Sequence, residues 1–354
     1  MRLKRARIES ILSREWLRRG ALATMLWPLS LFFHALVSLR RRMYASGMLK
    51  SEKIDRPVIV VGNIFIGGTG KTPFTIWLVQ RLQQAGYKPG VISRGYLSQD
   101  EKPRPVFPSS DPQQAGDEPV LIASRTRCPV MVGRKRVETA RALLEGHPEV
   151  NVIVSDDGLQ HYALARDLEI MLFDARGTGN GWMLPAGPLR EPASRRCDFA
   201  IVNLQADIAR FEGSELHREN AYPMHLVPGL LHRLEDATLT KSLKALGDAA
   251  RPDGHLRIVA AAGIGNPARF FSMLKSAGLV FDELPLPDHY AYQDNPFHGL
   301  RADIILITEK DAVKCRQIEH IRLDPRIWVV PVTADIDDVL ATKILERVRG
   351  SSIA

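Results

Sequence analysis

A glycine-rich segment between an apolar run and a helix-like run constrains this 354-residue chain more than any other feature. Residues 57–61 (PVIVV) predict a buried strand, and residues 72–85 predict a helix with Pro73 in its first turn, where a missing N–H does no harm. The segment between them reads Phe65-Ile66-Gly67-Gly68-Thr69-Gly70-Lys71-Thr72. Strand, glycine loop and helix in this order are typical of a phosphate-binding loop, because glycines let backbone N–H groups turn toward phosphate oxygens at a helix N-terminus.

Two side chains of this segment have the expected chemistry. Lys71 would reach the β- and γ-phosphates of ATP, and Thr72 would offer its hydroxyl to Mg²⁺. The strict pattern begins with glycine where this chain has Phe65. We therefore interpret the segment as a variant phosphate loop rather than as an ordinary glycine-rich turn.

A second acidic group is needed near the metal. Residues 151–157 (NVIVSDD) form an apolar run that ends in Asp156 and Asp157, as the acidic strand of such folds does. Asp156 would hold Mg²⁺ directly or through water, and the alternative is an ordinary strand-end aspartate in a turn. The loop that follows lies at the carboxyl end of the predicted sheet, where ligands bind in this class of fold.

The rest of the chain alternates strand-like and helix-like runs. Further strands are predicted at 89–93, 129–132, 151–155, 168–173, 199–204, 256–263, 302–308 and 326–332. Helices are predicted at 134–145 and 267–277, a loop at 98–113 and a connection at 222–245. This alternation predicts an α/β fold of the P-loop NTPase kind, a parallel sheet with helices on both faces.

The domain organisation that follows has four parts. Residues 1–56 are an N-terminal segment, 57–225 a kinase-like domain with the phosphate loop, 226–254 a connecting linker and 255–354 a smaller α/β lobe.

Charge separates the N-terminal segment from the rest. Residues 1–56 hold 13 Lys and Arg against 4 Asp and Glu, whereas the remaining 35 and 36 nearly cancel. The folded domains thus lack the basic excess typical of nucleic-acid binding, and we expect no nucleic-acid partner. Within the segment, residues 21–39 carry no charge and are followed by Arg40, Arg41 and Arg42.

These properties favour contact with anionic lipids. Nineteen apolar residues could just cross a bilayer, could lie in its interface, or could form a buried helix of a soluble protein. Three cysteines without a CxxC pair argue against a disulfide framework or a cysteine zinc site, which fits a reducing cytoplasm.

Taken together, the motifs resemble one family, the tetraacyldisaccharide 4′-kinases of lipid A synthesis. The matching segments are VGNIFIGGTGKTP (61–73), VISRGY (91–96), QAGDEP (114–119), SDDGLQH (155–161), NGWMLPAGPLREP (180–192), AAGIGNPARFF (262–271), LPDHYAY (286–292) and TEKDAVKC (308–315). The resemblance covers nearly the whole chain, and the family's own loop also lacks the first glycine.

The resemblance implies a reaction and a cellular location. Family enzymes transfer the γ-phosphate of ATP to the 4′-hydroxyl of a tetraacylated glucosamine disaccharide 1-phosphate. They do so at the cytoplasmic face of the bacterial inner membrane. The partners implied are the lipid disaccharide and anionic inner-membrane lipids, with no obligate protein partner. The family fold has two α/β/α lobes joined by a ribbon, with the active site in the cleft.

The resemblance also implies roles for single residues. Asp117 of GDEP would be the general base and His289 of LPDHY its partner, a pairing that we expect to require closure of the lobes. Glu118 and Asp156 would be acids of the metal site. Asp157, His161 and Arg190 would belong to the substrate and phosphate environment. Considered alone, Asp117 is a common turn residue, His289 a solvated loop histidine and Arg190 a rim ion-pair residue. The roles of Lys310 and Asp311, after a predicted strand, stay open.

Three other functions use the same phosphate loop. A membrane-associated switch ATPase would carry an additional lysine early in the loop, where this chain has Ile66, and would need no GDEP base. A soluble metabolite kinase would have no reason for residues 1–56. A non-catalytic nucleotide-binding scaffold would not need Lys71, Thr72 and Asp156.

Overall fold

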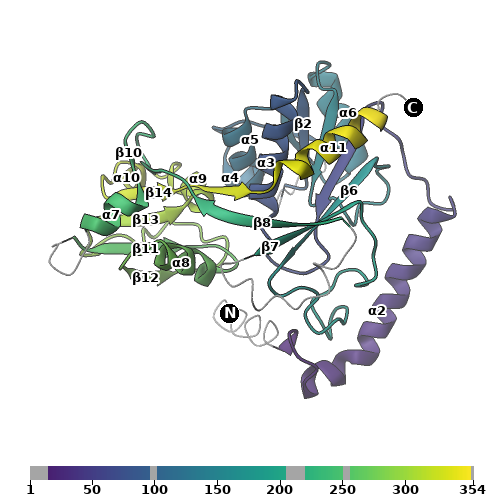
Figure 1. Cartoon of the computed structure of the whole chain (residues 1–354), viewed down its shortest axis with the longest axis horizontal. Helices are drawn as coiled ribbons and strands as arrows, with labels where there is room; N and C mark the ends of the chain where they lie inside the picture. The colour runs from purple at the N-terminus through teal and green to yellow at the C-terminus, as the bar shows by residue number, and fades with distance from the viewer. Residues whose placement is uncertain (1–14, 96–101, 205–219, 250–255, 352–354) are drawn as a thin grey trace.

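Two sheets organise the computed structural model, which describes residues 15–95, 102–204, 220–249 and 256–351 (Figure 1). The larger has nine strands in the order β15-β8-β7-β6-β1-β5-β2-β4-β3, and the smaller has six in the order β10-β9-β14-β13-β11-β12. Helices cover both sheets, so the predicted α/β class is confirmed.

The larger sheet has a parallel core. Its strands are β1 (Val58–Gly62), β2 (Pro89–Ser93), β3 (Arg104–Val106), β4 (Val130–Val132), β5 (Val152–Asp156), β6 (Leu168–Asp174), β7 (Phe199–Leu204), β8 (Ala221–Pro228) and β15 (Val332–Asp335). Only the two outermost pairings, β3 with β4 and β15 with β8, are antiparallel. Every residue of β1, β2, β5 and β7 is buried, as expected when helices cover both faces of a parallel sheet.

The helices of this part are α3 (Lys71–Gln84), α4 (Pro112–Ala115), α5 (Asp117–Thr126), α6 (Arg136–Gly146) and α11 (Asp338–Ser351). The predicted loop at 98–113 is wrong in part, because it contains β3 and the start of α4, while residues 98–101 lie outside the described residues. Strand β3 forms in a proline-rich stretch because it is an edge strand, where Pro105 faces no second partner.

The smaller sheet follows the predicted second α/β unit. Its strands are β9 (Leu231–Arg233), β10 (Thr240–Lys241), β11 (Ile258–Ala262), β12 (Asp282–Pro285), β13 (Ile304–Thr308) and β14 (Ile327–Val330). Its helices are α7 (Leu243–Ala249), α8 (Pro267–Ser276), α9 (Glu309–Cys315) and α10 (Glu319–Arg322). Buried side chains on the two faces of this sheet form two separate apolar clusters, so the unit has a core of its own.

The chain crosses between the two lobes twice, side by side. Strand β8 leaves the larger sheet at Pro228 and β9 enters the smaller one at Leu231, while β14 ends at Val330 and β15 begins at Val332. Gly229 N–H donates to the Pro331 carbonyl at 2.8 Å, which ties the two crossings together.

The C-terminal part therefore differs from the predicted 255–354 lobe. Pro331 interrupts the single strand expected at 326–332, and the chain after it returns to the larger sheet through β15 and α11. Likewise the predicted linker 226–254 contains the end of β8 together with β9, β10 and α7, while residues 250–254 lie outside the described residues.

Helix α2 (Ala21–Ala45) lies along one side of the larger lobe (Figure 1). Its inner side docks on the 180–196 segment: the Ser30 hydroxyl donates to the Met183 carbonyl at 2.7 Å, and the Trp27 and Trp182 rings are 6.1 Å apart. The opposite side exposes a row of large apolar side chains spaced by three and four residues: Met25, Leu29, Phe32, Leu36 and Leu39.

This arrangement excludes the buried-helix alternative for residues 21–39. In the described part of the chain, α2 alone has the length and apolar character that a membrane span requires, and only 11% of its most apolar stretch is buried. Of the arginines that follow, Arg40 lies over the Tyr162 ring and Arg41 lies 4.0 Å from Glu191, so the protein itself engages both in part.

Candidate active site

The glycine-rich loop joins β1 to α3 as predicted. Gly70 precedes the helix with φ 92°, a left-handed conformation that favours glycine. A Cβ atom there would lie 2.5 Å from the Asn203 side chain, whose amide donates to the Thr69 carbonyl at 3.0 Å. The loop conformation therefore depends on Gly70 and is held from outside by β7.

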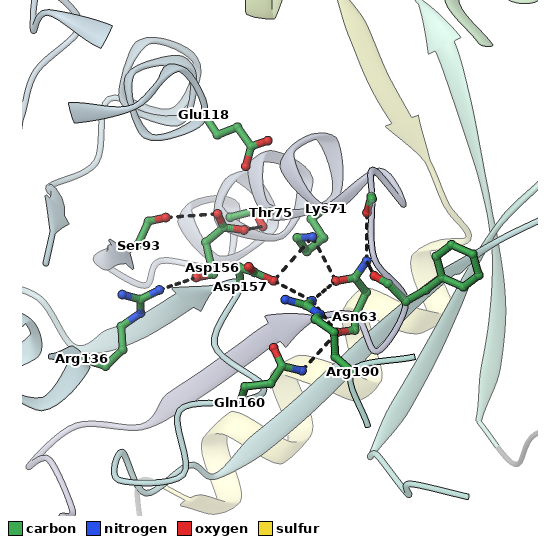
Figure 2. Close-up of polar contacts among 12 residues, drawn as sticks. Asn63, Lys71, Thr75, Ser93, Glu118, Arg136, Asp156, Asp157, Gln160 and Arg190 are labelled. Carbon is green, nitrogen blue, oxygen red and sulfur yellow. Dashed lines mark hydrogen bonds and ion pairs between the residues drawn. The ribbon is translucent and has the colours of Figure 1, made fainter. Parts of the chain in front are cut away.

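Lys71 ends in a polar network shown in Figure 2. Its ammonium donates to Asn63 Oδ1 at 3.1 Å and lies 3.5 Å from Asp157 Oδ1. Asn63 also spans the base of the loop, where its amide donates to the carbonyls of Phe65 and Gly67. Arg190 completes the network, because its guanidinium donates to the Asn63 carbonyl at 2.7 Å and to Asp157 at 3.2 Å.

Asp157 is ionised in this network. Burial alone would raise the pKa of its carboxyl, but the charges of Lys71 and Arg190 outweigh burial and hold the pKa well below its ordinary value. The residue has φ 48°, so the chain turns sharply as β5 ends and aims Asp157 at the phosphate loop. Asp157 and Arg190, predicted from the DDGLQH and PLREP segments, thus meet beside Lys71.

Asp156 points to the other side of the same turn. Its carboxylate accepts hydrogen bonds from Thr75 at 3.1 Å and Ser93 at 3.4 Å (Figure 2). Burial, together with the negative charges of Glu118 and Asp157, raises the pKa of Asp156 well above its ordinary value. The negative charges around Asp156 therefore oppose its ionisation, and a cation bound there would relieve that repulsion.

This donor set fits Mg²⁺ that arrives with a nucleotide. Within the described residues, no three His, Cys, Asp or Glu side chains are grouped closely enough to hold a metal by themselves. Mg²⁺ needs only one or two carboxylates when phosphate oxygens and waters supply the other ligands. Asp156, Glu118 and the Thr72 hydroxyl are suited to that partial set.

Asp117 and His289 come together from different lobes. Asp117 is the first residue of α5, and His289 follows β12 with φ 57°. His289 Nδ1 lies 3.2 Å from Asp117 Oδ2, although the two residues are 172 positions apart. The pairing that we expected to need lobe closure is therefore present in this structure.

The electrostatics keep Asp117 ionised. Burial would raise the pKa of its carboxyl, but the hydrogen bond to His289 and the charges of Lys310 and Lys314 outweigh burial and bring the pKa well below its ordinary value. Lys314 Nζ lies 3.5 Å from the same carboxylate oxygen as His289.

Helix α9 connects the second lobe to this site. Lys310 pairs with Glu118 across the lobes at 2.9 Å. Asp311 is fully buried and accepts hydrogen bonds from the Thr308 hydroxyl at 2.6 Å and from Gly263 N–H at 3.1 Å. Lys310 therefore faces the site, whereas Asp311 holds the strand ends beneath it.

A cleft of about 690 Å³ lies between the lobes. The first lobe lines it with the glycine loop and Glu118, and the second lobe contributes residues of α8, of α9 and of the turn before α8, among them Asn266, Arg269, Met273 and Lys310. The loop segment Gly68–Thr72 faces this cleft, so bound phosphates would lie between the lobes.

His161 lies in basic surroundings, where Asp157 is the acidic group that acts on it most strongly. Burial, together with the charges of Arg136 and Arg94, lowers the pKa of its imidazole to about 4, although the charge of Asp157 opposes this shift. His161 is therefore neutral near pH 7 and can donate or accept a hydrogen bond without carrying charge.

Sequence reasoning did not assign several residues that the fold brings to the site. Asn63, Lys314 and Arg269 each lie inside a segment that carried the resemblance, so their positions were noted without a role. Arg136 and Arg176 lie outside those segments. The signal that finds all five is the charged or polar groups that they meet in space, which only the fold reveals.

Comparison with known proteins places this geometry in context. The family profile described as tetraacyldisaccharide-1-P 4′-kinase matches residues 22–349. A protein of Janthinobacterium sp. named tetraacyldisaccharide 4′-kinase is 57% identical over 355 residues, covering 100% of both chains. One of the same name from Herminiimonas arsenicoxydans is 55% identical over 359 residues, covering 99% of both. A crystal structure of "apo" form LpxK from Aquifex aeolicus in complex with ATP superimposes with a TM-score of 0.75 at 27% identity, covering 92% of this chain and 99% of that one.

Proposed function

The chain belongs to the tetraacyldisaccharide-1-P 4′-kinase family, and we propose that the Asp117–His289 pair is the catalytic centre of its reaction. That reaction transfers the γ-phosphoryl group of ATP to the 4′-hydroxyl of a tetraacylated glucosamine disaccharide 1-phosphate, a lipid A precursor. The observation that carries the proposal is the 3.2 Å contact between Asp117 and His289. It stands next to Glu118, which lines the same cleft as the phosphate loop.

Asp117 accepts the proton of the attacking hydroxyl. A carboxylate whose pKa lies below its ordinary value is a weak base, but phosphoryl transfer through a loose transition state removes the proton late and needs an oriented acceptor more than a strong one. His289 fixes the orientation of Asp117 through Nδ1, and Lys314 stabilises its charged form.

The phosphate loop and Lys71 bind the triphosphate. Lys71 exchanges its contacts with Asn63 and Asp157 for the β- and γ-phosphate oxygens. When Mg²⁺ is bound with ATP, it neutralises charge on these oxygens, and Asp156, Glu118 and Thr72 are the side chains that would hold it. On the second lobe, the apolar side chains of Ile264 and Met273 line the cleft and would pack against the adenine base of ATP.

The acceptor enters from the side of Arg190, Asp157 and His161. Arg190 already donates to Asp157, so its remaining donors and the neutral His161 imidazole are suited to sugar hydroxyl or phosphate oxygens of the disaccharide. This assignment follows the position of the three residues at the carboxyl end of β5 and in the segment that packs under α2.

The N-terminal helix holds the enzyme at the cytoplasmic face of the inner membrane. We infer that α2 lies in the interface rather than across the bilayer, because Ser30 and Trp27 dock one side of the helix on the protein. The exposed row that includes Phe32 and Leu36 would then enter the acyl region, and Arg42 is the arginine left to meet anionic head groups.

A panel of acceptors tests the function. The purified protein is incubated with ATP, Mg²⁺ and glucosamine disaccharide 1-phosphates with and without acyl chains. We expect ADP to form in step with the 4′-phosphorylated acylated product, and little phosphate release when no acceptor is present. Phosphate release without acceptor would favour a switch ATPase instead. Lys71→Ala should lower turnover by at least about 10³-fold, since it removes charge from the transition state.

A further inference from the structure

An arginine of the second lobe lies in the cleft, and its positive charge is poorly neutralised by the carboxylates around it. Arg269 belongs to α8, its side chain is only 17% exposed, and it lines the cleft that the phosphate loop also lines. Within the described residues, its guanidinium donates no hydrogen bond and has one ion pair, to Asp174 Oδ2 at 3.6 Å. Its Nε atom is buried without a partner in that same set. A guanidinium has five N–H donors, so such an arrangement is costly unless an anion completes it.

Asp174 does not supply that completion, because Arg176 already occupies it. Arg176 Nε donates to both oxygens of Asp174, at 3.0 and 3.1 Å, and its Nη2 donates to Oδ2 at 2.7 Å. One buried carboxylate is thus shared by two guanidiniums, which leaves an excess positive charge. Burial lowers the pKa of Arg269, and the charge of Arg176 lowers it further while Asp174 opposes both.

The excess charge stands at the phosphate loop. Arg176 Nη2 donates to the Gly68 carbonyl at 3.3 Å, and its guanidinium lies 4.2 Å from the centre of the Phe65 ring. Asp174 is the last residue of β6, the strand next to β1, from which the loop emerges. Arg269 reaches this point from the other lobe, so the two arginines and the loop converge from three separate segments.

We propose that Arg269 is an arginine finger supplied by the second lobe, whose guanidinium contacts the transferring phosphoryl group of ATP. The inference rests on the proposed role of the phosphate loop. In the reaction the bond from the γ-phosphorus to the β–γ bridging oxygen breaks, and a bond to the acceptor oxygen forms. The electron pair of the broken bond stays on ADP, and the acceptor proton goes to Asp117. Arg269 gives only N–H donors, which stabilise the charge that builds on the oxygens around phosphorus.

The position of Arg269 gives the finger a further property. Because α8 belongs to the second lobe and the loop to the first, the contact forms only when the lobes face each other across a bound nucleotide. The pairing of Asp117 with His289 also joins the two lobes, and it is already formed in this structure. Charge stabilisation and proton acceptance would therefore be assembled by one arrangement of the two lobes.

The experiment compares Arg269→Ala and Arg269→Lys with Arg257→Ala in the full-length protein. Arg257 precedes β11 in the same lobe, is 59% exposed and pairs with Asp282 away from the cleft. We expect Arg269→Ala to lower kcat by about 10³-fold, the lower end of arginine-finger effects, with a much smaller change in KM for ATP. Added guanidinium ion should restore part of the lost kcat. Arg257→Ala should behave as the parent.

Arg269→Lys keeps a positive charge near Asp174 but loses the planar fork. We therefore expect a melting temperature close to that of the parent together with a clear loss of kcat. If Arg269→Ala keeps kcat within about threefold, the finger is wrong and Arg269 only braces Asp174. The same conclusion follows if added guanidinium restores no kcat and the melting temperature of Arg269→Lys falls together with its kcat. Lys71→Ala is measured in parallel: an active Lys71→Ala enzyme would refute the proposed function itself, whereas an inactive one beside an active Arg269→Ala would refute this inference alone.

Discussion

Asp117 is a residue whose surroundings, more than its type, set its chemistry. As the first residue of α5 it resembles many aspartates that begin helices, yet His289 and Lys314 both contact the same carboxylate oxygen. Two groups that act as a unit should not contribute independently to catalysis. If Asp117 and His289 act together, substituting both should therefore give a non-additive loss of activity, which an ordinary helix-start aspartate would not.

We expect Asp117→Ala to lower kcat far more than it changes KM for ATP, and His289→Ala to give a milder loss. The double variant should lose less than the sum of the two losses in activation free energy, because removing one partner already disables the other. Steady-state kinetics of the four proteins measures this. His298→Ala, an exposed histidine of the same lobe, is the control. Strictly additive losses would mean that the two residues act separately.

The lowered pKa of Asp117 also predicts how stability depends on pH. Burial opposes ionisation, but His289, Lys310 and Lys314 outweigh it, so the folded protein releases the proton more readily than the unfolded chain. The stabilisation is then complete above the unfolded pKa of about 3.9 and is lost as pH falls below about 4. Asp117→Asn should be less stable than the parent at pH 7, and the difference should shrink below about pH 4. Denaturant unfolding across pH 3–7 measures it, with the exposed Asp55→Asn as a control that should show no such trend.

Among single residues, the sequence was sufficient to predict a site residue wherever a motif determines the local geometry. Lys71 and Asp156 follow from a strand–loop–helix pattern and an acidic strand end, which are local properties. Arg269 and Asn63 required the fold, because their importance lies in which distant groups they meet. Unpartnered donors and shared carboxylates exist only in three dimensions.

At the scale of elements, α2 shows what hydropathy reveals and what it hides. The uncharged run predicted a membrane-seeking helix, but only the structure divides its surface into a docked side and an exposed side. Removing residues 1–42 would also remove Phe33 and Val37 and so expose the core of the larger lobe against which they pack. Substitution on one side of the helix is therefore a cleaner test than truncation.

We expect the double variant Phe32→Ser, Leu36→Ser to bind anionic vesicles more weakly and to retain its affinity for ATP. Each buried CH₂ contributes about 0.8 kcal/mol to membrane binding, so two large side chains carry a measurable share. Vesicle sedimentation gives the result. Val280→Ser changes an even more exposed apolar residue on the second lobe and should leave vesicle binding unchanged. If the double variant sediments like the parent, the exposed row is not the membrane contact.

At the scale of the whole molecule, the two lobes are not consecutive pieces of chain. Alternating strands and helices predicted both sheets, yet the return of β15 and α11 to the larger sheet was not predicted. Val332 continues directly from an apolar run that belongs to the other sheet, and no local pattern marks the transfer except Pro331. Where a strand pairs is decided by its partners, here β8, and not by its own composition.

This return predicts that the C-terminal helix stabilises the lobe that holds the phosphate loop. Leu340 on α11 is fully buried in the apolar cluster of the larger sheet, together with residues of α3, and its neighbour Val339 is 49% exposed. Leu340→Ala should cost about 2–5 kcal/mol of unfolding free energy, whereas Val339→Ala should change it by at most about 0.5 kcal/mol. Because α3 begins at Lys71, we also expect ATP to raise the melting temperature of Leu340→Ala, since binding stabilises the folded state. Thermal unfolding with and without ATP measures both effects. A Leu340→Ala protein that melts in two steps, with the ATP-stabilised step unchanged from the parent, would show that α11 does not support the larger lobe.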